Sequence, residues 1–406
     1  MATKVFHKLQ RLDHAWLSLS PIKNLFLSFK QVLPLVIIDT YWRLFSKLFL
    51  APDAFFTTVL FRYHSKALRT PFLTQGITNI LDYLVVTFVV AIWTKKYLGE
   101  HLDNDRDTLL PVTVNFGLVL MQAFLTVSNQ GQLTLHMGLA LLIAYLVNLS
   151  YLGLTKITKN HLPDMGFGYL IWAALISIAV TYLHANMPFI LSQGTYTTFF
   201  SSDFFAHFYS LAIVAVLTPI LFVLGISIPL DLTTGATDLA QVNANLNSVY
   251  QSVMATLPQP QNIYSVITSS ALIGGVGATL ALALLLLLSR NKENRRIGLW
   301  TLIPTLFDNN QIMAYGLPLF FRPLTLVPMI LSSLWGSLAA SVAIKVGFIR
   351  PVVFSVPNGS PHLLLGFLAS QTPWRSLLVS FIVLLGAICI YWPFVKSLLA
   401  QEENHG

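Results

Sequence analysis

The sequence has one cysteine in 406 residues, Cys389, which lies within a long apolar run. A single thiol excludes a disulfide framework and a metal site built from several thiolates. We expect Cys389 to be buried in the last helix, which also excludes a covalent cysteine carrier that works in water. The sequence therefore predicts neither a metal ion nor a cofactor in this chain.

Charged side chains are also scarce. Asp, Glu, Lys and Arg make up 10% of the chain and hydrophobic residues make up 55%, whereas an ordinary soluble domain is about 25% charged. The mean hydropathy is +0.69. These values predict an all-α polytopic membrane protein.

Common catalytic motifs are missing as well. The sequence contains no Walker loop, no HExxH and no GxSxG motif. The run IGGVGATL at residues 273–280 does not match GxGxxG and follows no strand, so a dinucleotide site is not expected. We predict no catalytic residue from motifs of this kind.

The basic residues indicate topology. The net charge is +8, but the cations gather between apolar runs at Lys95 and Lys96, at Lys156 and Lys159, and within residues 290–296. Cytoplasmic loops of membrane proteins carry this bias, so we expect no nucleic-acid partner. Residues 1–30 lack the features of a cleavable signal peptide. Their alternating basic and apolar residues predict an amphipathic helix on the cytoplasmic surface of the membrane lipid. Residues 399–406 are then a cytoplasmic tail.

Several apolar runs reach the length of about 20 residues that a membrane span needs. A shorter run covers residues 363–369, so nine or ten crossings are expected, with the shorter runs as re-entrant candidates. The predicted spans lie near residues 31–50, 73–94, 109–127, 133–154, 168–187, 205–229, 266–289, 325–347 and 374–395.

Residues 304–323, PTLFDNNQIMAYGLPLFFRP, are the most informative stretch. Four consecutive polar residues, from Asp308 to Gln311, precede Gly316, Pro318 and Pro323. Such a stretch cannot cross lipid as a plain helix, because its backbone groups need partners from protein or from a water-filled cavity. We interpret it as a re-entrant segment that lines a site; a plain loop between two spans is the alternative.

Other broken segments follow residue 220. They are the break at Gly225 and Pro229, the glycine run of residues 273–280, and VPNGSPH at residues 356–362. Glycines allow close backbone approach to a ligand, although tight helix packing explains them equally well. Neutral amides and hydroxyls in these segments predict a cavity for an uncharged polar solute such as a sugar.

Few ionisable residues occur in the broken segments, and each has two interpretations. A functional role is the first for all of them. The structural alternatives are a helix cap for Asp231, a position at the membrane surface for Asp308, snorkelling for Arg322 and a buried structural role for His362.

In its second half, the chain resembles the membrane permease component, enzyme IIC, of the phosphoenolpyruvate-dependent sugar phosphotransferase system, in the lactose/cellobiose/chitobiose branch. The resemblance rests on four stretches in the same order: IGGVGATL, the segment that ends YGLPLFFRP, VPNGSP, and TPWRSLLVSFIVLLGAICIYWPFVK. Any one of these is weak, whereas four in order are fairly specific.

The resemblance implies a homodimer in the bacterial plasma membrane, with about ten transmembrane helices per protomer and two re-entrant hairpins. It implies a dimer-interface domain at residues 31–200 and a sugar-binding domain at residues 201–398. It also implies transport of a β-linked disaccharide, which a separate IIB protein phosphorylates from its charged cysteine.

The chain departs from that family at two positions that are titratable there. Ser227 stands where the family usually has a histidine, and Gln311 stands in place of an acidic residue. Serine and glutamine can bind hydroxyls but cannot act as a general base. Asp308 or Asp231 is a candidate for the missing carboxylate. The predicted sugar-binding residues are Ser227, Asn245, Asp308, Asn310, Gln311, Asn358, Ser360 and His362.

Three functions fit the sequence. The first is an active sugar permease with an unusual pocket, and the second is a non-transporting paralogue that acts as a membrane sugar sensor or accessory protein. The third is an unrelated secondary transporter, which needs a coupling-ion site; the scarcity of buried carboxylates weighs against it. A cytoplasmic docking patch for IIB is one interpretation of the basic residues Arg290, Lys292, Arg295 and Arg296. The other is that they only reflect the basic bias of cytoplasmic loops.

Overall fold

The computed structural model describes residues 2–51, 53–61, 76–102, 108–128, 137–157, 166–186, 198–226, 239–252 and 256–403. Every named element in these ranges is helical, and β pairing is limited to the single bridges Ala54–Asn358 and Val352–Ser370. The prediction of a mostly helical protein is confirmed.

The described residues of the first half form eight elements. They are α1 (Ala2–Leu17), α2 (Ser20–Phe45), the π-helical turns η1 (Ser46–Leu50) and η2 (Phe56–Phe61), α3 (Ile77–Gly99), α4 (Leu109–Ser128), α5 (Met137–Ile157) and α6 (Gly166–Asn186).

The second half is built from shorter and more interrupted elements. They are η7 (Asp203–Ala206), α8 (Phe208–Val223), α9 (Ala240–Gln251), the π-helical segment η9 (Ile263–Ala271), α10 (Thr279–Leu287), α11 (Lys292–Leu306), α12 (Gln311–Gly316), α13 (Pro323–Lys345), α14 (His362–Ala369) and α15 (Pro373–Glu403).

Five stretches of the described chain are long and apolar enough to cross a membrane. They are Ser20–Leu50, Ile77–Gly99, Met137–Ile157, Pro323–Lys345 and Pro373–Lys396, and shorter apolar helices cover Leu109–Met121, Phe167–Leu183 and Phe208–Val223. The first stretch begins at Ser20, earlier than the predicted residue 31, because α1 already ends at Leu17 and Pro21 favours the first turn of a new helix.

The predicted span at residues 266–289 is wrong as a single helix. The structure has η9 and α10 there, separated by residues 272–278. Gly274, Gly275 and Gly277 all adopt positive φ in this loop, a conformation that a right-handed helix cannot contain. We call residues 272–278 the glycine loop.

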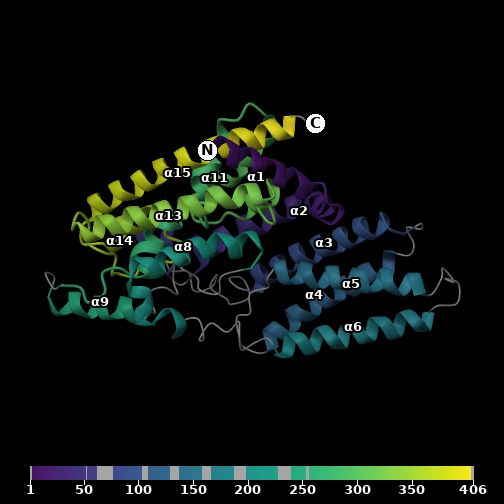
Figure 1. Ribbon diagram of the computed structural model, residues 1–406. Coiled ribbons are helices and arrows are strands. Elements are labelled where there is room, and N and C mark those ends of the chain that lie inside the picture. The colour runs from purple at the N-terminus through teal and green to yellow at the C-terminus, as the bar shows by residue number, and fades with distance from the viewer. Residues whose placement is uncertain are drawn as a thin grey trace.

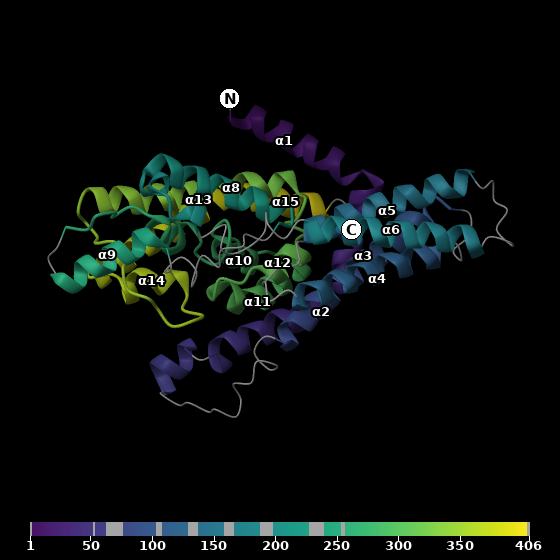
Figure 2. The same cartoon turned by 90° about the horizontal axis from the view of Figure 1, so that it is seen from below.

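The helices form two groups that α2 joins. Figures 1 and 2 show α3, α4, α5 and α6 together at one end of the molecule, and α8, α9, α13 and α14 toward the other. Helix α2 packs on α3 and also on α12. At the second contact the ring of Phe29 meets the edge of Tyr315, with 5.1 Å between centroids.

The core follows the same division. One apolar cluster is confined to α3–α6 and includes Tyr97, Leu118, Tyr151 and Trp172. A larger cluster contains side chains from α2, α3 and α5 together with most helices of the second half. The first group therefore packs largely on itself, and α2 carries it against the interrupted helices.

Polar side chains join the first group internally. Asn115 of α4 donates to Asn148 of α5 at 2.9 Å and to Thr94 of α3 at 3.1 Å, and all three residues are buried. Hydrogen bonds between side chains hold helices together where lipid surrounds them. The sequence pattern alone indicated little polarity in this half.

Cys389 is exposed on α15, not buried as the sequence predicted. An apolar helix that faces lipid has the same composition as one that faces the core, so composition could not place this thiol.

Candidate functional site

Three broken segments meet around Asp308. This residue lies in the turn between α11 and α12, and its carboxylate contacts the glycine loop and the start of α14. The turn requires a left-handed backbone at Asp308, with φ of 64°, a conformation that Asp tolerates better than most residues. The Asp308 side chain is 8% exposed and therefore faces protein.

Both oxygens of the Asp308 carboxylate accept a hydrogen bond from the backbone. Oδ1 accepts the backbone N–H of Gly274 at 2.8 Å, and Oδ2 accepts the backbone N–H of His362 at 2.7 Å. The His362 ring atom Nδ1 lies 3.2 Å from Oδ1. Asp308 therefore fixes its neighbours in place and is a positioning residue.

The hydrogen bonds of His362 settle where its proton lies. Nδ1 is 2.9 Å from the carbonyl oxygen of Leu272 and 3.2 Å from Asp308 Oδ1. Both are acceptors only, so Nδ1 carries a hydrogen in either charge state. In the neutral ring, Nε2 is then a proton acceptor, and this buried atom has no hydrogen-bond partner in the described part of the chain. Lys47 of η1 also acts on the ring electrostatically.

The glycine loop needs its glycines because the turn at Asp308 lies directly against it. A Cβ at Gly275 would come within 3.1 Å of the Asp308 carbonyl oxygen and of Asn310 Cγ. The Tyr391 hydroxyl of α15 donates to the carbonyl of Gly277 at 2.6 Å. Close backbone approach explains these glycines, and the approaching group is protein.

Asn310 and Gln311 point in different directions from the same turn. The Asn310 amide donates to the Val276 carbonyl in the glycine loop at 3.4 Å. The Gln311 side-chain oxygen faces the hydroxyl of Thr40 on α2 at 3.5 Å. The structure therefore brings Asn310 to the site and turns Gln311 toward the first half.

Asn358 and Ser360 lie in the segment that leads to His362. The backbone of Asn358 pairs with the chain after η1, through Asp53 and Phe55 at 2.8 and 2.9 Å, while its side-chain oxygen is buried without a partner in the described residues. The Ser360 hydroxyl donates to the Pro357 carbonyl at 2.7 Å and closes the turn.

One predicted sugar-binding residue that the structure describes, Asn245, does not join this group. Asn245 of α9 is buried, and its amide makes two hydrogen bonds to the backbone of Gln259, at 2.6 and 2.9 Å. It closes the connection between α9 and η9. Ser227 and Asp231 lie outside the described residues.

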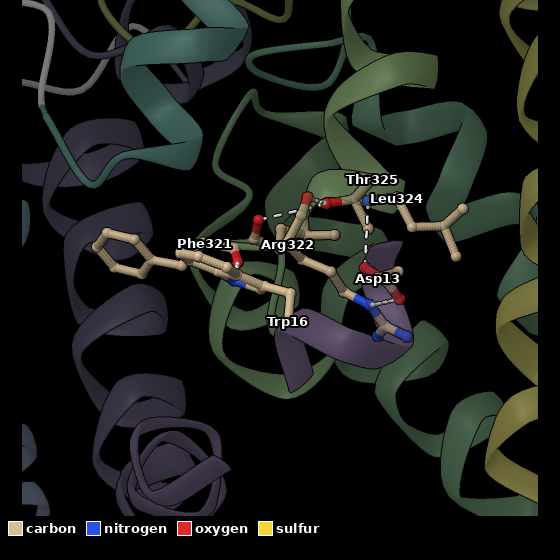
Figure 3. A network of polar contacts seen from close by, with 7 residues as sticks. Asp13, Trp16, Phe321, Arg322, Leu324 and Thr325 are labelled. Atoms are coloured by element: carbon tan, nitrogen blue, oxygen red, sulfur yellow. Dashed lines mark hydrogen bonds and ion pairs between the residues drawn. The ribbon is translucent and has the colours of Figure 1, made fainter. Parts of the chain in front are cut away.

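Arg322 is buried and paired, so the snorkelling interpretation is wrong. Its Nε lies 3.3 Å from Asp13 Oδ2 on α1, and the other oxygen of Asp13 accepts the N–H of Leu324 at 3.2 Å. Trp16 of α1 donates to the Phe321 carbonyl at 2.6 Å. Figure 3 shows α1 lying across the start of α13 through these contacts. Helix α1 therefore fixes the end of the stretch at residues 304–323.

Sequence reasoning missed a second polar cluster, between the two halves. Asp39 and Arg43 of α2 and Asp82 of α3 form an ion cluster beside α12. A weak signal existed, since Asp39 lies inside an apolar run and Arg43 follows at the helical spacing of four. Asp82 lies far along the chain, so only the fold shows the complete group.

Together these features define a polytopic helical membrane protein with a buried polar junction, built from broken helices in its second half. Comparison with known proteins makes the class more specific. No family model matches the chain. YwbA of Bacillus subtilis, which is named a permease IIC component, is 34% identical over 126 residues, covering 30% of this chain and 28% of YwbA.

Two further relatives carry related names. The cellobiose-specific EIIC component of Lactococcus lactis is 29% identical over 132 residues, or 32% of this chain and 27% of that protein. The lactose-specific EIICB component of Staphylococcus aureus is 26% identical over 136 residues, or 32% of this chain and 24% of that protein. Over 30–32% of its length this chain is thus similar to IIC components of the sugar phosphotransferase system, and each match spans less than a third of the relative's own length.

A solved structure also aligns with the chain. It is the crystal structure of the transporter ChbC, the IIC component of the N,N'-diacetylchitobiose-specific phosphotransferase system. The alignment covers 98% of each chain, with 16% sequence identity and a TM-score of 0.44.

Proposed function

We propose that this chain is a IIC-like permease that binds a sugar and moves it across the bacterial cell membrane for phosphorylation by a separate IIB protein. A β-linked disaccharide is the proposed substrate, because the cellobiose- and lactose-specific relatives are named for sugars of that type. The observation that carries the proposal is the buried, unpartnered Nε2 of His362 at the junction of three broken segments.

In this proposal, a sugar hydroxyl donates its hydrogen bond to His362 Nε2. The hydroxyl oxygen then bonds to the phosphorus held by the IIB cysteine, the S–P bond breaks, and the hydroxyl proton passes to Nε2. Asp308 holds the ring through Nδ1 at 3.2 Å and stabilises the positive charge that develops on it. General-base assistance of this kind contributes roughly 10²- to 10⁴-fold to a rate.

Neutral groups near His362 complete the proposed sugar site. The buried side-chain oxygen of Asn358 has no partner in the described residues and is available to a sugar hydroxyl. Asn310 and Ser360 provide further polar atoms at the same junction. We assign Asn245 to the support of the site, since both of its amide atoms already bind backbone, and we keep Ser227 as a proposed sugar-binding residue.

The proposed architecture assigns residues 31–200 to a homodimer interface and residues 201–398 to sugar binding, with the N-terminus in the cytoplasm. The division agrees with the apolar cluster that is confined to α3–α6. Exposed apolar side chains on α5 and α6, such as Leu146, Leu170 and Leu175, provide a surface for a second protomer or for lipid.

A membrane sugar sensor or accessory protein is the second candidate. Gln311 favours it, because its amide faces Thr40 on α2 and not His362. Sugar bound at the junction could then be reported to the first half without any transfer of phosphate.

Uptake of labelled cellobiose, lactose and chitobiose tests the proposal, in cells with and without a functional phosphoenolpyruvate relay. Accumulation of sugar phosphate that depends on the relay is the expected result. Sugar binding to the purified protein without accumulation would favour the sensor. The absence of both binding and uptake would contradict both candidates.

A further inference from the structure

Asp39 is a buried acidic residue that the proposed sugar chemistry does not use. It lies in the membrane-spanning stretch Ser20–Leu50 and is 1% exposed. Neither of its carboxylate oxygens accepts a hydrogen bond from any described residue. A buried carboxylate without hydrogen bonds is rare in proteins, because losing its water costs several kcal/mol.

The neighbouring charges do not compensate for this cost. Arg43, one turn further along α2, forms a close ion pair with Asp82 of α3, and its Nη2 lies 3.9 Å from Asp39 Oδ2. Two carboxylates thus share one guanidinium. Tyr315 of α12 is the other titratable group that faces Arg43. With both aspartates ionised, the cluster carries an uncompensated negative charge.

One added positive charge removes this imbalance, and a proton fits better than a metal ion. Hard cations take six or more oxygen ligands, whereas the described residues contain no group of three or more His, Cys, Asp or Glu side chains that could hold one. A protonated Asp39 also becomes a hydrogen-bond donor, and the Asp82 carboxylate lies within its reach.

We propose that Asp39 is a proton-binding site, which holds one proton between α2 and α3 and donates it in a hydrogen bond to Asp82. Its position suggests a use for that proton. Thr40, the next residue, faces Gln311 of α12 at 3.5 Å, so the site lies where α2 contacts the interrupted helices. Separation of α2 from α12 would admit water to Asp39 and release the proton.

In the sequence alone, the scarcity of carboxylates within apolar runs argues against ion coupling. The structure removes that objection, since Asp13 and Asp39 are both buried. Asp13 is hydrogen-bonded and paired with Arg322, whereas no residue in the described part of the chain donates a hydrogen bond to Asp39. Asp13 is therefore a structural carboxylate, whereas Asp39 needs a proton.

Infrared spectroscopy of the purified protein in lipid tests the site without any sugar. We expect the carbonyl stretch of a protonated carboxyl group at neutral pH. It should shift in D₂O and in protein labelled with [4-¹³C]aspartate, disappear in Asp39→Asn, and persist in Asp53→Asn, which removes an exposed carboxylate. Absence of the band in the wild type at neutral pH, or its survival in a folded Asp39→Asn variant, would overturn the proposal. The isotope shift assigns the band to an aspartate even where the variant fails to fold.

The use of the proton is tested separately and rests on the proposed transport function. If each cycle releases the Asp39 proton, sugar uptake by the wild type should vary with external pH and uptake by Asp39→Asn should vary less. An infrared band without sugar uptake would leave the proton site standing and refute transport. Uptake with an unchanged pH profile in Asp39→Asn would refute the coupling alone.

Discussion

His362 carries the proposed chemistry because one ring nitrogen is fixed and the other is unpaired. Nδ1 is held by Leu272 and Asp308, and Nε2 has no partner in the described chain. The sequence predicted this histidine as one of eight sugar-binding residues but assigned no chemistry to either ring nitrogen. Its tautomer follows from two acceptors that lie 90 and 54 residues away.

We expect His362→Gln to reduce the relay-dependent formation of sugar phosphate by roughly 10²- to 10⁴-fold. The amide of glutamine reaches about as far as Nε2 and can still hydrogen-bond a sugar hydroxyl, but it cannot take a proton. Sugar binding by the purified protein, measured by calorimetry, should change far less than phosphorylation in the same variant. Equal losses of binding and phosphorylation would contradict a role as a base.

Asp308→Asn should act mainly on stability. The carboxylate accepts hydrogen bonds on both oxygens, from Gly274 and from His362. An asparagine amide offers one acceptor and places N–H groups against a donor, at a cost of about 1–3 kcal/mol. Thermal unfolding in lipid measures the loss, and Asp53→Asn, at an exposed aspartate, is the matched control. Unchanged stability would show that Asp308 does not join the three segments.

At the scale of elements, helix α1 packs on the second half of the chain, although it begins the chain. The sequence predicted an amphipathic helix on the membrane surface. The structure places one of its faces on α13, with Asp13 buried against Arg322 and Trp16 bound to Phe321 (Figure 3). The amphipathic pattern predicted a helix but not what that helix contacts.

Breaking this contact should destabilise the protein strongly. Asp13→Ala leaves the buried Arg322 without its carboxylate, which costs about 3–5 kcal/mol. The double variant Asp13→Ala with Arg322→Met should be more stable than Asp13→Ala alone, because the unpaired charge is gone. Glu293→Ala breaks the exposed pair with Lys30 and should cost at most about 1 kcal/mol. Thermal unfolding of these variants checks the order, and equal effects at the two sites would contradict it.

Contact between η9 and α13 depends on Gly336. A Cβ there would lie 2.5 Å from the carbonyl oxygen of Ser270 and 2.9 Å from its carbon. Because backbone cannot yield as a side chain can, Gly336→Ala should lower stability by about 1–3 kcal/mol. Gly117→Ala in α4 is the control, since nothing lies within 4 Å of its added methyl group, and it should be neutral or stabilising. Similar melting temperatures for both variants would contradict the close contact.

At the scale of the whole molecule, the two helix groups present different surfaces. Helices α5 and α6 expose many large apolar side chains, among them Leu146, Leu170, Leu175 and Ile178. Large exposed apolar patches mark surfaces covered by protein or lipid. Composition predicted such surfaces, but not which helices would carry them.

The proposed homodimer is tested on this surface by cross-linking. In a Cys389→Ser background, Leu175→Cys on α6 should give a disulfide-linked dimer in membranes. Leu338→Cys, at an exposed position on α13 in the other helix group, should remain monomeric. Cross-linking through Leu338→Cys alone would move the interface to the second half.

The sequence by itself determined the class of this protein. The length and polarity of the apolar runs predicted α3, α4, α5, α6 and α13 close to their observed bounds, because a helix in lipid must satisfy its backbone locally and bury enough apolar residues to cross. The start of α15 was also predicted, but this helix continues to Glu403, beyond the predicted end at residue 395. The broken segments were also visible, since glycine, proline and amides interrupt a helix wherever they occur. Local chemistry was sufficient for these features.

Only the tertiary structure decided which broken segments meet. Asp308 joins His362 across 54 residues, Asp13 reaches Arg322 across 309, and Asn245 turns to Gln259 and away from the junction. The same polar side chain can cap a turn, pair with a charge or await a ligand, and these outcomes differ only in the donors and acceptors that folding brings within about 3 Å of it. That choice depends on how the helices pack, which no single stretch of sequence contains.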